Sequence, residues 1–337
     1  MKTISVLGID LAKSVFQLHG IDELGNVSLR CQLRRAGLIQ RMANLPRCTV
    51  AMEACGGAHH WAREFKKLGH EVKLIAPQFV KPYLKSNKND RNDAEAICEA
   101  ATRPHMRFVP IKTTHQQDIQ SLHRRRSRLV GNRTALINEV RGLVHEYGIV
   151  LAKSPAQFRR ALVSLLDSER LTPKMCSLLM RAHARLVAMD EEMKWFNDEI
   201  ERHFEADENC KRIGKIEGIG PITATAVIAA LPDPGLFKSG RHFSAFLGLV
   251  PRQNSTGGKT TLLGISKRGD VYLRTLLIHG ARSVVRHAAN KSDKRSLWVN
   301  SKDKSRGRNK ACVAVANKNA RIIWAMLAHG TEYRTAA

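Results

Sequence analysis

The sequence lacks any close pairing of cysteines. Seven cysteines are spread over 337 residues, and none forms a C-x-x-C or similarly short spacing. This scatter excludes a zinc knuckle and a disulfide framework. We therefore expect reduced thiols, as in a cytosolic protein. The seven are Cys31, Cys48, Cys55, Cys98, Cys176, Cys210 and Cys312.

Long apolar runs are also missing. No stretch of eighteen apolar residues occurs, and the start MKTISVLGID has no extended apolar segment behind a basic one. These absences argue against a membrane-spanning helix and a secretory signal. We expect a cytoplasmic protein with no membrane partner.

Acidic residues are scarce relative to basic ones. The chain holds 56 Lys and Arg against 30 Asp and Glu, which gives a formal net charge of +26 and a pI near 10.3. Such a balance favours a polyanionic partner, with nucleic acid the leading candidate. A ribosomal-type or merely solubilising basic surface is the alternative, because basicity indicates a partner and not a chemistry.

The N-terminal region is typical of an α/β domain of the ribonuclease-H-like class. Three strands in a meander precede alternating helices and strands, in the order βββαβαβα, which predicts a mixed sheet flanked by helices. The expected strands are 4–9, 15–20, 27–34, 49–52 and 71–75, and the expected helices are 36–45, 60–68 and one beginning near Arg91.

Beyond Arg107 the periodicity becomes helical. Residues 116–145 and 173–203 each place apolar residues at helical spacing among many charges, which predicts two long helices that pack antiparallel as a coiled coil. Packing within one chain is favoured over pairing between chains. Near Gly214 the composition becomes rich in Gly, Pro, Ser and Thr. We therefore predict an α/β domain at 1–108, a helical coiled-coil region at 109–209 and a mainly α domain at 210–337.

One segment near the C-terminus is dense in Lys and Arg. Residues 290–310 carry eight basic residues and two Asp, with turn-forming residues between them. We expect a mobile arm that becomes ordered on nucleic acid.

Four carboxylates are candidate metal ligands. Asp10 and Glu53 end the first and fourth predicted strands, and Asp90 and Asp93 share one face of a helix start. Such a cluster repels itself unless cations are present. Two divalent ions can activate an attacking oxygen and stabilise a leaving oxygen at a scissile phosphate. Carboxylate oxygens without His or Cys partners favour Mg²⁺ or Mn²⁺ over zinc.

Each acid also has an ordinary interpretation. Asp90 or Asp93 could cap the helix, and Glu53 could simply be exposed at a strand end. The joint pattern in this topological order favours the catalytic interpretation.

Two C-terminal motifs suit phosphate. The segment GIGP before an apolar run resembles a helix-hairpin-helix turn, although a plain helix start is equally consistent with it. The stretch LVPRQNSTGGKTTLLGISKRGD combines Ser255, Thr256, Gly257 and Gly258 with several cations. A hydroxyl among cations can attack a phosphodiester, and a passive phosphate-binding loop is the alternative.

Together GIDLAK, AMEACGG, KNDRNDAEA, GIGPITA and GLVPRQNSTGGK resemble the DEDD transposases of the Piv-invertase-like insertion-sequence family. The resemblance runs from Ile4 to about Leu327. It implies a RuvC-like N-terminal domain, a coiled-coil spacer and a C-terminal transposase domain. It further implies a recombinase that forms a serine–DNA intermediate and is guided by a noncoding bridge RNA.

The resemblance assigns metal binding to Asp10, Glu53, Asp90 and Asp93. Ser255 is the expected nucleophile because a primary hydroxyl is less hindered, with Thr256 as the alternative, since in some relatives the nucleophile directly precedes the glycine. We predict a site-specific DNA recombinase that forms a dimer or tetramer through residues 112–205. A RuvC-like nuclease that uses water on branched DNA is the second hypothesis, and a basic architectural nucleic-acid binder is the third.

Overall fold

The computed structural model describes residues 3–85, 89–231 and 233–334. The chain forms two compact units, Met1–His115 and Gln116–Ala337, and each is considered by itself. Within the described residues, every helix is too short or too polar to cross a bilayer.

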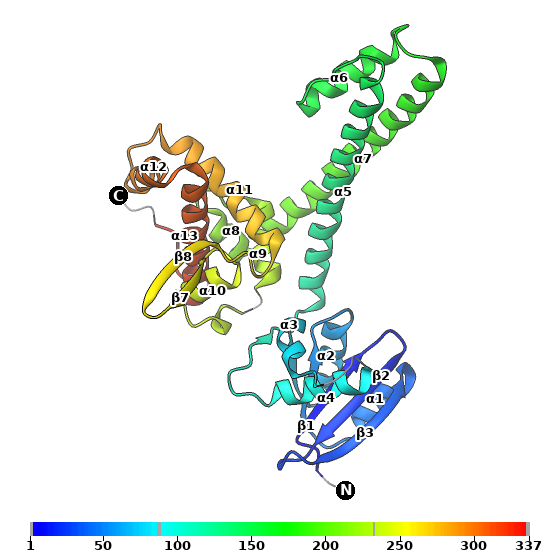
Figure 1. Cartoon of the computed structure of the whole chain (residues 1–337), viewed down its shortest axis with the longest axis vertical. Helices are drawn as coiled ribbons and strands as arrows, with labels where there is room; N and C mark the ends of the chain where they lie inside the picture. The colour runs from blue at the N-terminus through cyan, green and yellow to red at the C-terminus, as the bar shows by residue number, and fades with distance from the viewer. Residues whose placement is uncertain (1–2, 86–88, 232, 335–337) are drawn as a thin grey trace. The chain divides into compact units, whose positions relative to one another are not determined.

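The first unit is built on a six-stranded mixed sheet (Figure 1). The strands lie in the order β3-β2-β1-β4-β5-β6. The first three form an antiparallel meander, β4 and β5 run parallel to β1, and β6 is antiparallel to β5. The strands are β1 Val6–Leu11, β2 Val15–Ile21, β3 Val27–Arg34, β4 Thr49–Glu53, β5 Glu71–Ile75 and β6 Phe108–Val109.

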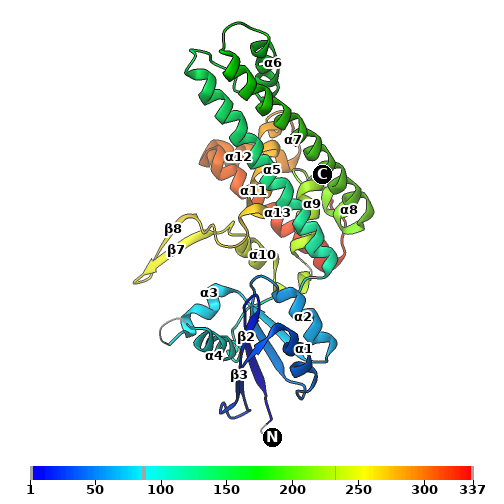
Figure 2. The same ribbon diagram turned by 90° about the vertical axis from the view of Figure 1, so that its right-hand side faces the viewer.

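Helices cover both faces of this sheet, as the mixture of strands and helices in the sequence predicts. Figure 2 shows α1 (Arg35–Ala43) and α2 (Ala58–Lys67) on one side and α3 (Pro77–Val80) and α4 (Asp90–Ala101) on the other. Each side has its own apolar core, one centred on aromatic residues of β2 and α2 and one on small residues of α4. The architecture is consistent with the predicted ribonuclease-H-like class.

The second unit begins with a pair of long helices. Both views show α5 (Thr114–His145) and α7 (Pro173–Ala206) side by side, with α6 (Pro155–Leu166) packed near one end of the pair (Figures 1 and 2). Their apolar faces share one core. The two long helices were predicted from periodicity, whereas α6 was not.

His123 ties α5 to the remainder of this unit. Its imidazole is buried and lies 3.0 Å from both the Tyr272 hydroxyl and Thr225 Oγ1. Because Thr225 donates its own proton to the Pro221 carbonyl, its oxygen accepts from His123 Nε2. Burial lowers the pKa of His123 to about 4, so the ring is neutral at pH 7.

The rest of the second unit is mostly helical, with one exposed β-hairpin formed by β7 (Pro251–Thr256) and β8 (Lys259–Ile265). The helices surround a single apolar core. They are α8 Glu208–Gly214, α9 Pro221–Ala230, α10 Gly240–Phe246, α11 Val271–Ala288, α12 Lys294–Arg306 and α13 Arg308–His329. A short 3-10 turn lies at Pro234–Leu236, and the first unit has another at Lys81–Tyr83.

The expectation of a mobile basic arm at residues 290–310 was wrong. This segment forms α12 and the start of α13. Asp293 caps α12 by accepting from the backbone N–H of Ser296 at 3.0 Å, and Ser296 and Val299 are buried. Arg295 bonds to Asn319 at 2.6 Å and pairs with Glu217. A cap, a buried face and the contacts of Arg295 therefore hold this basic segment as a helix packed on the rest of the unit.

Candidate metal centre

Neighbouring parallel strands position the first two acids. The register of β1 and β4 pairs Val6 with Thr49 and ends with Ile9 opposite Met52. Asp10 and Glu53 are the next residue on each strand, so both acids stand at the same edge of the sheet. Each is half-buried. This part of the geometry follows the prediction from strand ends.

The other two acids come from the first turn of α4. Asn89 is the N-cap, and its side-chain oxygen accepts from the backbone N–H of Asn92 at 2.9 Å. Asp90 and Asp93 both lie in the first turn. The alternative that one of these two acids caps the helix was therefore wrong. Lys88, which opens the KNDRNDAEA motif, lies outside the described residues.

A glycine brings α4 onto β1. A methyl group on Gly8 would lie 2.3 Å from the carbonyl oxygen of Ala94 and 2.7 Å from the backbone nitrogen of Cys98. No side chain fits into that space, so only glycine permits so close an approach. The N-terminal turn of α4 consequently lies over the end of β1, where Asp10 stands.

Three of the four predicted ligands meet. Asp10, Asp90 and Asp93 can each offer a carboxylate oxygen such that these oxygens all lie within 4.8 Å of one another. Glu53 is not in this group, although its charge is near enough to raise the pKa of Asp10. Asp10 is half-buried, Asp93 is half-buried and Asp90 is exposed.

The neighbouring acids destabilise the charged form of Asp10. Burial, together with the negative charges of Asp93, Asp90 and Glu53 in that order, raises the pKa of Asp10 to about 6. The raised pKa means that, without a cation, ionisation of Asp10 is less favourable in the folded protein than in the unfolded chain.

Within the described part of the chain, no ion pair relieves this repulsion. Among the residues that the structure describes, Asp10, Asp90 and Asp93 form no ion pair. Other acids of α4 do find such partners, since Glu95 pairs with Arg30 and Glu99 with Lys85. In a chain of net charge +26, three converging carboxylates without a basic partner fit a divalent cation, which prefers such hard oxygen ligands.

Ser255, the predicted nucleophile, lies elsewhere in the chain. It is an exposed residue of β7 in the second unit, whereas the acid group belongs to the first unit. Gln253 Nε2 donates to its hydroxyl oxygen at 2.7 Å. The residues around it form a β-hairpin and not the predicted loop, because Gly257 and Gly258 both adopt positive φ (56° and 78°) and make a two-residue turn.

Sequence reasoning missed two contributors to the acid site. Gly8 gave a signal only as a glycine within a strand, which indicates close approach of another backbone. Cys55 was set aside with the other cysteines, yet the charges of Glu53 and Asp10 act on it and, together with burial, raise the pKa of its thiol. Cys55 follows Met52, the last residue of β4 that pairs with β1, by three residues. That position at the end of the strand could have indicated that Cys55 lies near the acids.

Two family profiles match the chain, one over most of the first unit and the start of the second and one within the second. A profile of DEDD transposases of the IS110 type, described as "Transposase", matches residues 7–149 and contains all four acids. The profile described as "Transposase IS116/IS110/IS902 family" matches residues 210–296 and contains the β-hairpin.

Similar proteins extend over the full length. The chain is 52% identical to the transposase for insertion sequence element IS1111A of Coxiella burnetii, over 100% of this chain and 93% of the relative. It is 43% identical to the transposase for insertion sequence element IS1328 of Yersinia enterocolitica, over 99% of each. The chain belongs to the IS110/IS116 family of DEDD transposases. This transposase is thus an enzyme that acts on DNA in transposition of an insertion sequence.

Membership also bears on the acid cluster. DEDD transposases are typically dependent on divalent metal ions, and the profile that covers the cluster is the DEDD one. The resemblance predicted from the motifs is confirmed at the level of the IS110/IS116 family.

Proposed function

We propose that Asp10, Asp90 and Asp93, with Glu53 beside them, hold Mg²⁺ or Mn²⁺ against a DNA phosphodiester in this transposase. The observation that carries the proposal is the convergence of three carboxylates within 4.8 Å of one another without a basic partner among the described residues. When bound, the ions would supply Lewis-acid stabilisation of the developing charge. The chain's own part is to fix the carboxylates in one place through β1, β4 and α4.

Excision of the element tests this site. A plasmid that carries the element and its flanking DNA would be propagated with wild-type or variant protein, and the rejoined donor junction would be quantified. Asp10→Asn keeps the shape of the side chain and removes its charge, so junctions should fall by at least about 100-fold. Glu23→Gln, an exposed acid of the same unit, is the matched control and should change little. Equal excision by Asp10→Asn and wild type would refute the metal site.

The second part of the proposal assigns the nucleophile to Ser255. Its Oγ would attack phosphorus, an Oγ–P bond would form, and the bond from phosphorus to the leaving sugar oxygen would break. The proton of the serine hydroxyl would end on that leaving oxygen. Exposure of the β7–β8 hairpin supports this assignment, because a DNA strand can reach the hydroxyl without any rearrangement of a core.

A covalent adduct is the diagnostic product. Protein, Mn²⁺ and element-end DNA labelled on one strand would be mixed and then denatured. We expect a labelled band at the mass of protein plus DNA, which Ser255→Ala abolishes and Thr256→Ala retains. Loss in Thr256→Ala alone would move the role to Thr256, and retention in both variants would contradict a hydroxyl nucleophile.

A nuclease that activates water is the second candidate. It is supported by one observation, the convergence of Asp10, Asp90 and Asp93 within the first unit, because a metal-bound water needs no protein hydroxyl as nucleophile. A RuvC-like reaction of this kind on branched DNA would release free ends in the presence of metal and give no adduct under the conditions above.

Three further assignments follow from the motif resemblance. We propose the division 1–108, 109–209 and 210–337, a homodimer or homotetramer formed through residues 112–205, and guidance by a noncoding bridge RNA. Separate apolar cores in the long helices and in the C-terminal helices support the last two divisions. Digestion of copurified nucleic acid with ribonuclease, followed by sequencing, tests the RNA, and the mass of the DNA-bound particle tests the assembly.

A further inference from the structure

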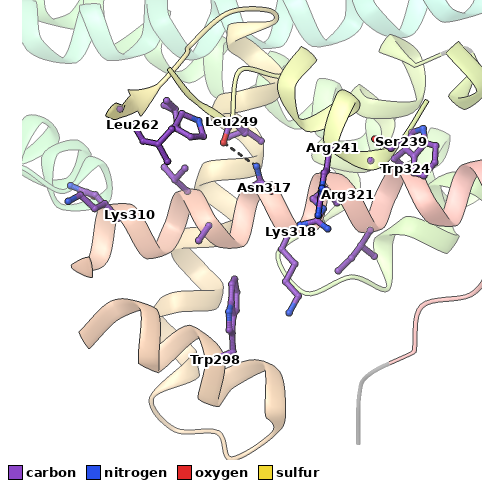
Figure 3. Close-up of a pocket in the computed structure, with 18 of the residues that line it drawn as sticks. Ser239, Arg241, Leu249, Leu262, Trp298, Lys310, Asn317, Lys318, Arg321 and Trp324 are labelled. Carbon is purple, nitrogen blue, oxygen red and sulfur yellow. Dashed lines mark hydrogen bonds between the residues drawn. The ribbon is translucent and has the colours of Figure 1, made fainter. Parts of the chain in front are cut away.

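An open groove of about 1410 Å³ runs along α13 in the second unit (Figure 3). The face of α13 from Asn309 to Ala325 forms its floor. One wall is the β8 segment Leu262–Ile265, and Trp298 of α12 contributes the opposite side. Sixteen helical steps between the ends of the floor correspond to about 24 Å. The groove is therefore long enough to hold several residues or nucleotides of an extended chain.

The lining is largely apolar and carries charge of one sign. The apolar lining includes leucine, valine and isoleucine side chains and two indoles, those of Trp298 and Trp324. Trp324 is fixed by a hydrogen bond from its Nε1 to the Pro234 carbonyl at 3.0 Å. The charged lining residues are Arg241, Lys310, Lys318 and Arg321, and among the described residues that line the groove none is acidic.

Within the ranges that the structure describes, three of these four cations have no acidic partner, and the fourth lies over an indole ring. In the described part of the chain, Arg241, Lys310 and Arg321 form no ion pair, and Figure 3 shows Arg241 of α10 beside Arg321 of α13. Lys318 places its Nζ 4.4 Å from the centroid of the Trp298 ring. Burial and the neighbouring charges of Arg295 and Arg321 lower the pKa of Lys318. An anionic group entering the groove would relieve this crowding of positive charge.

A second, smaller pocket adjoins the groove at Asn309, which lines both. Its volume is about 330 Å³, and Arg282, Arg286, His287 and Arg308 surround it. Arginine forks suit the oxygens of a phosphate. The groove therefore provides apolar and aromatic surface, and the adjoining pocket provides a cluster of positive charge.

The ligand that combines both properties is a nucleic-acid strand with its bases unpaired. A duplex hides its bases and presents phosphates, so it would leave the indoles and aliphatic side chains of the groove in water. Bases of a single strand can stack on aromatic rings while arginine and lysine follow the backbone. DNA is the nucleic acid on which this family acts, and exchange of strands requires that bases leave their pairs.

We infer that the α13 groove, continued by the arginine pocket, binds an unpaired stretch of a DNA strand during transposition. The inference depends on the family's action on DNA and is independent of the metal site and of the nucleophile. Because β8 forms one wall, a strand in the groove would pass along the hairpin that also contains Ser255.

The test compares a single strand with a duplex on full-length protein. Fluorescence anisotropy would follow labelled oligo(dT) of about twelve nucleotides, oligo(rU) of equal length and a duplex of the same length. Trp298→Leu should weaken oligo(dT) binding by about tenfold. The double variant Arg241→Gln with Arg321→Gln should also weaken it and lower the slope of log affinity against log salt by about 1.4. Duplex binding should change less than twofold.

Matched variants separate the groove from general surface charge. Trp195→Leu removes a tryptophan of α7 that is 52% exposed, and Arg181→Gln with Arg185→Gln removes two exposed arginines of the same helix. Both controls should retain oligo(dT) affinity. Unchanged affinity in the groove variants, or equal loss for oligo(dT) and duplex, would overturn the inference. A loss confined to oligo(rU) would assign the groove to RNA, and a lower particle mass in Trp298→Leu would make it a contact between copies of the chain.

Discussion

Gly8 of β1 lies so close to Ala94 of α4 that a methyl group on the glycine would stand 2.3 Å from the alanine carbonyl oxygen. This approach fixes the distance between the end of β1 and the first turn of α4. Asp10 follows Gly8 by two residues, and Asp90 and Asp93 precede or adjoin Ala94 on the helix. The spacing of the acid group is therefore set by backbone contact.

Gly8→Ala should open this contact. The added methyl must displace α4, and overpacking of this kind typically costs about 1–3 kcal/mol of unfolding free energy. Displacement would also separate the acids, so affinity for Mn²⁺ should fall. Gly37→Ala is the control, because nothing lies within 4 Å of a methyl at that position of α1. Urea unfolding measures the stability of the two variants, and Mn²⁺ titration measures their affinity for metal. Equal stability and equal affinity in both variants would show that α4 is held by other contacts.

Removal of the Asp10 carboxylate should stabilise the metal-free protein at high pH. The pKa of Asp10 is raised from 3.8 to about 6 in the folded chain, so ionisation of this group reduces stability as pH rises through about 6. At pH 8 without divalent ions, Asp10→Asn should therefore melt at a higher temperature than wild type, and this advantage should vanish toward pH 4.

Addition of Mg²⁺ or Mn²⁺ should raise the melting temperature of wild type and have little effect on Asp10→Asn, since binding to the folded state alone stabilises it. Differential scanning fluorimetry measures both shifts, with Glu23→Gln as the charge-matched control. An equal rise in all three proteins would mean that the ions act outside the acid group.

The buried imidazole of His123 predicts a loss of stability in mild acid. Its pKa is lowered from 6.5 to about 4. Between pH 6.5 and pH 4 the imidazole is therefore protonated in the unfolded chain and neutral in the folded chain. Stability is complete above pH 6.5 and falls as pH decreases toward 4, by on the order of 3 kcal/mol in total. Urea unfolding at pH 7 and pH 5 measures the effect.

His123→Gln should flatten this dependence, although it also disturbs the contacts to Tyr272 and Thr225. His145→Gln, on the same helix and exposed, should leave the dependence as in wild type. A wild-type stability that stays constant from pH 7 to pH 5 would show that the ring titrates normally.

Asp190 joins three helices through two arginines. Its carboxylate lies 2.8 Å from Arg133 Nη1 of α5 and 2.5 Å from Arg159 Nη2 of α6, while Asp190 itself belongs to α7. Asp190→Asn would leave two cations without a counter-charge, and about 1 kcal/mol of local stability should be lost after allowance for solvent. Faster hydrogen exchange of the α6 amides would report the loss. Glu191→Gln, exposed on the same helix, provides the comparison, and identical exchange in both variants would contradict the role of Asp190.

Local patterns in the sequence predicted the framework of the first unit well. Strand β3 and strand β5 have the predicted bounds, because each is a short apolar or alternating run between turn residues. Asp10 and Glu53 were placed at one sheet edge by the rule that parallel strands end together. Short elements such as α3 and β6 were not predicted, because few residues give too little periodicity to detect.

Long-range packing could not be derived in the same way. The basic segment at 290–310 gave a signal of charge and turn residues, and it was taken for a mobile arm. Its helical state depends on burial of Ser296 and Val299 and on contacts of Arg295 with Asn319 and Glu217, which are distant in the sequence. The α13 groove was also invisible, since its lining residues come from five separate elements.

The apolar interior of this transposase is divided among several separate clusters, with the sheet of the first unit and the helices of the second each enclosing its own. A substitution that destabilises one apolar cluster leaves the contacts within the other clusters unchanged. Because Asp10, Asp90 and Asp93 all belong to the first unit, a substitution that weakens the C-terminal core removes none of the residues that form the acid group or the sheet beneath it.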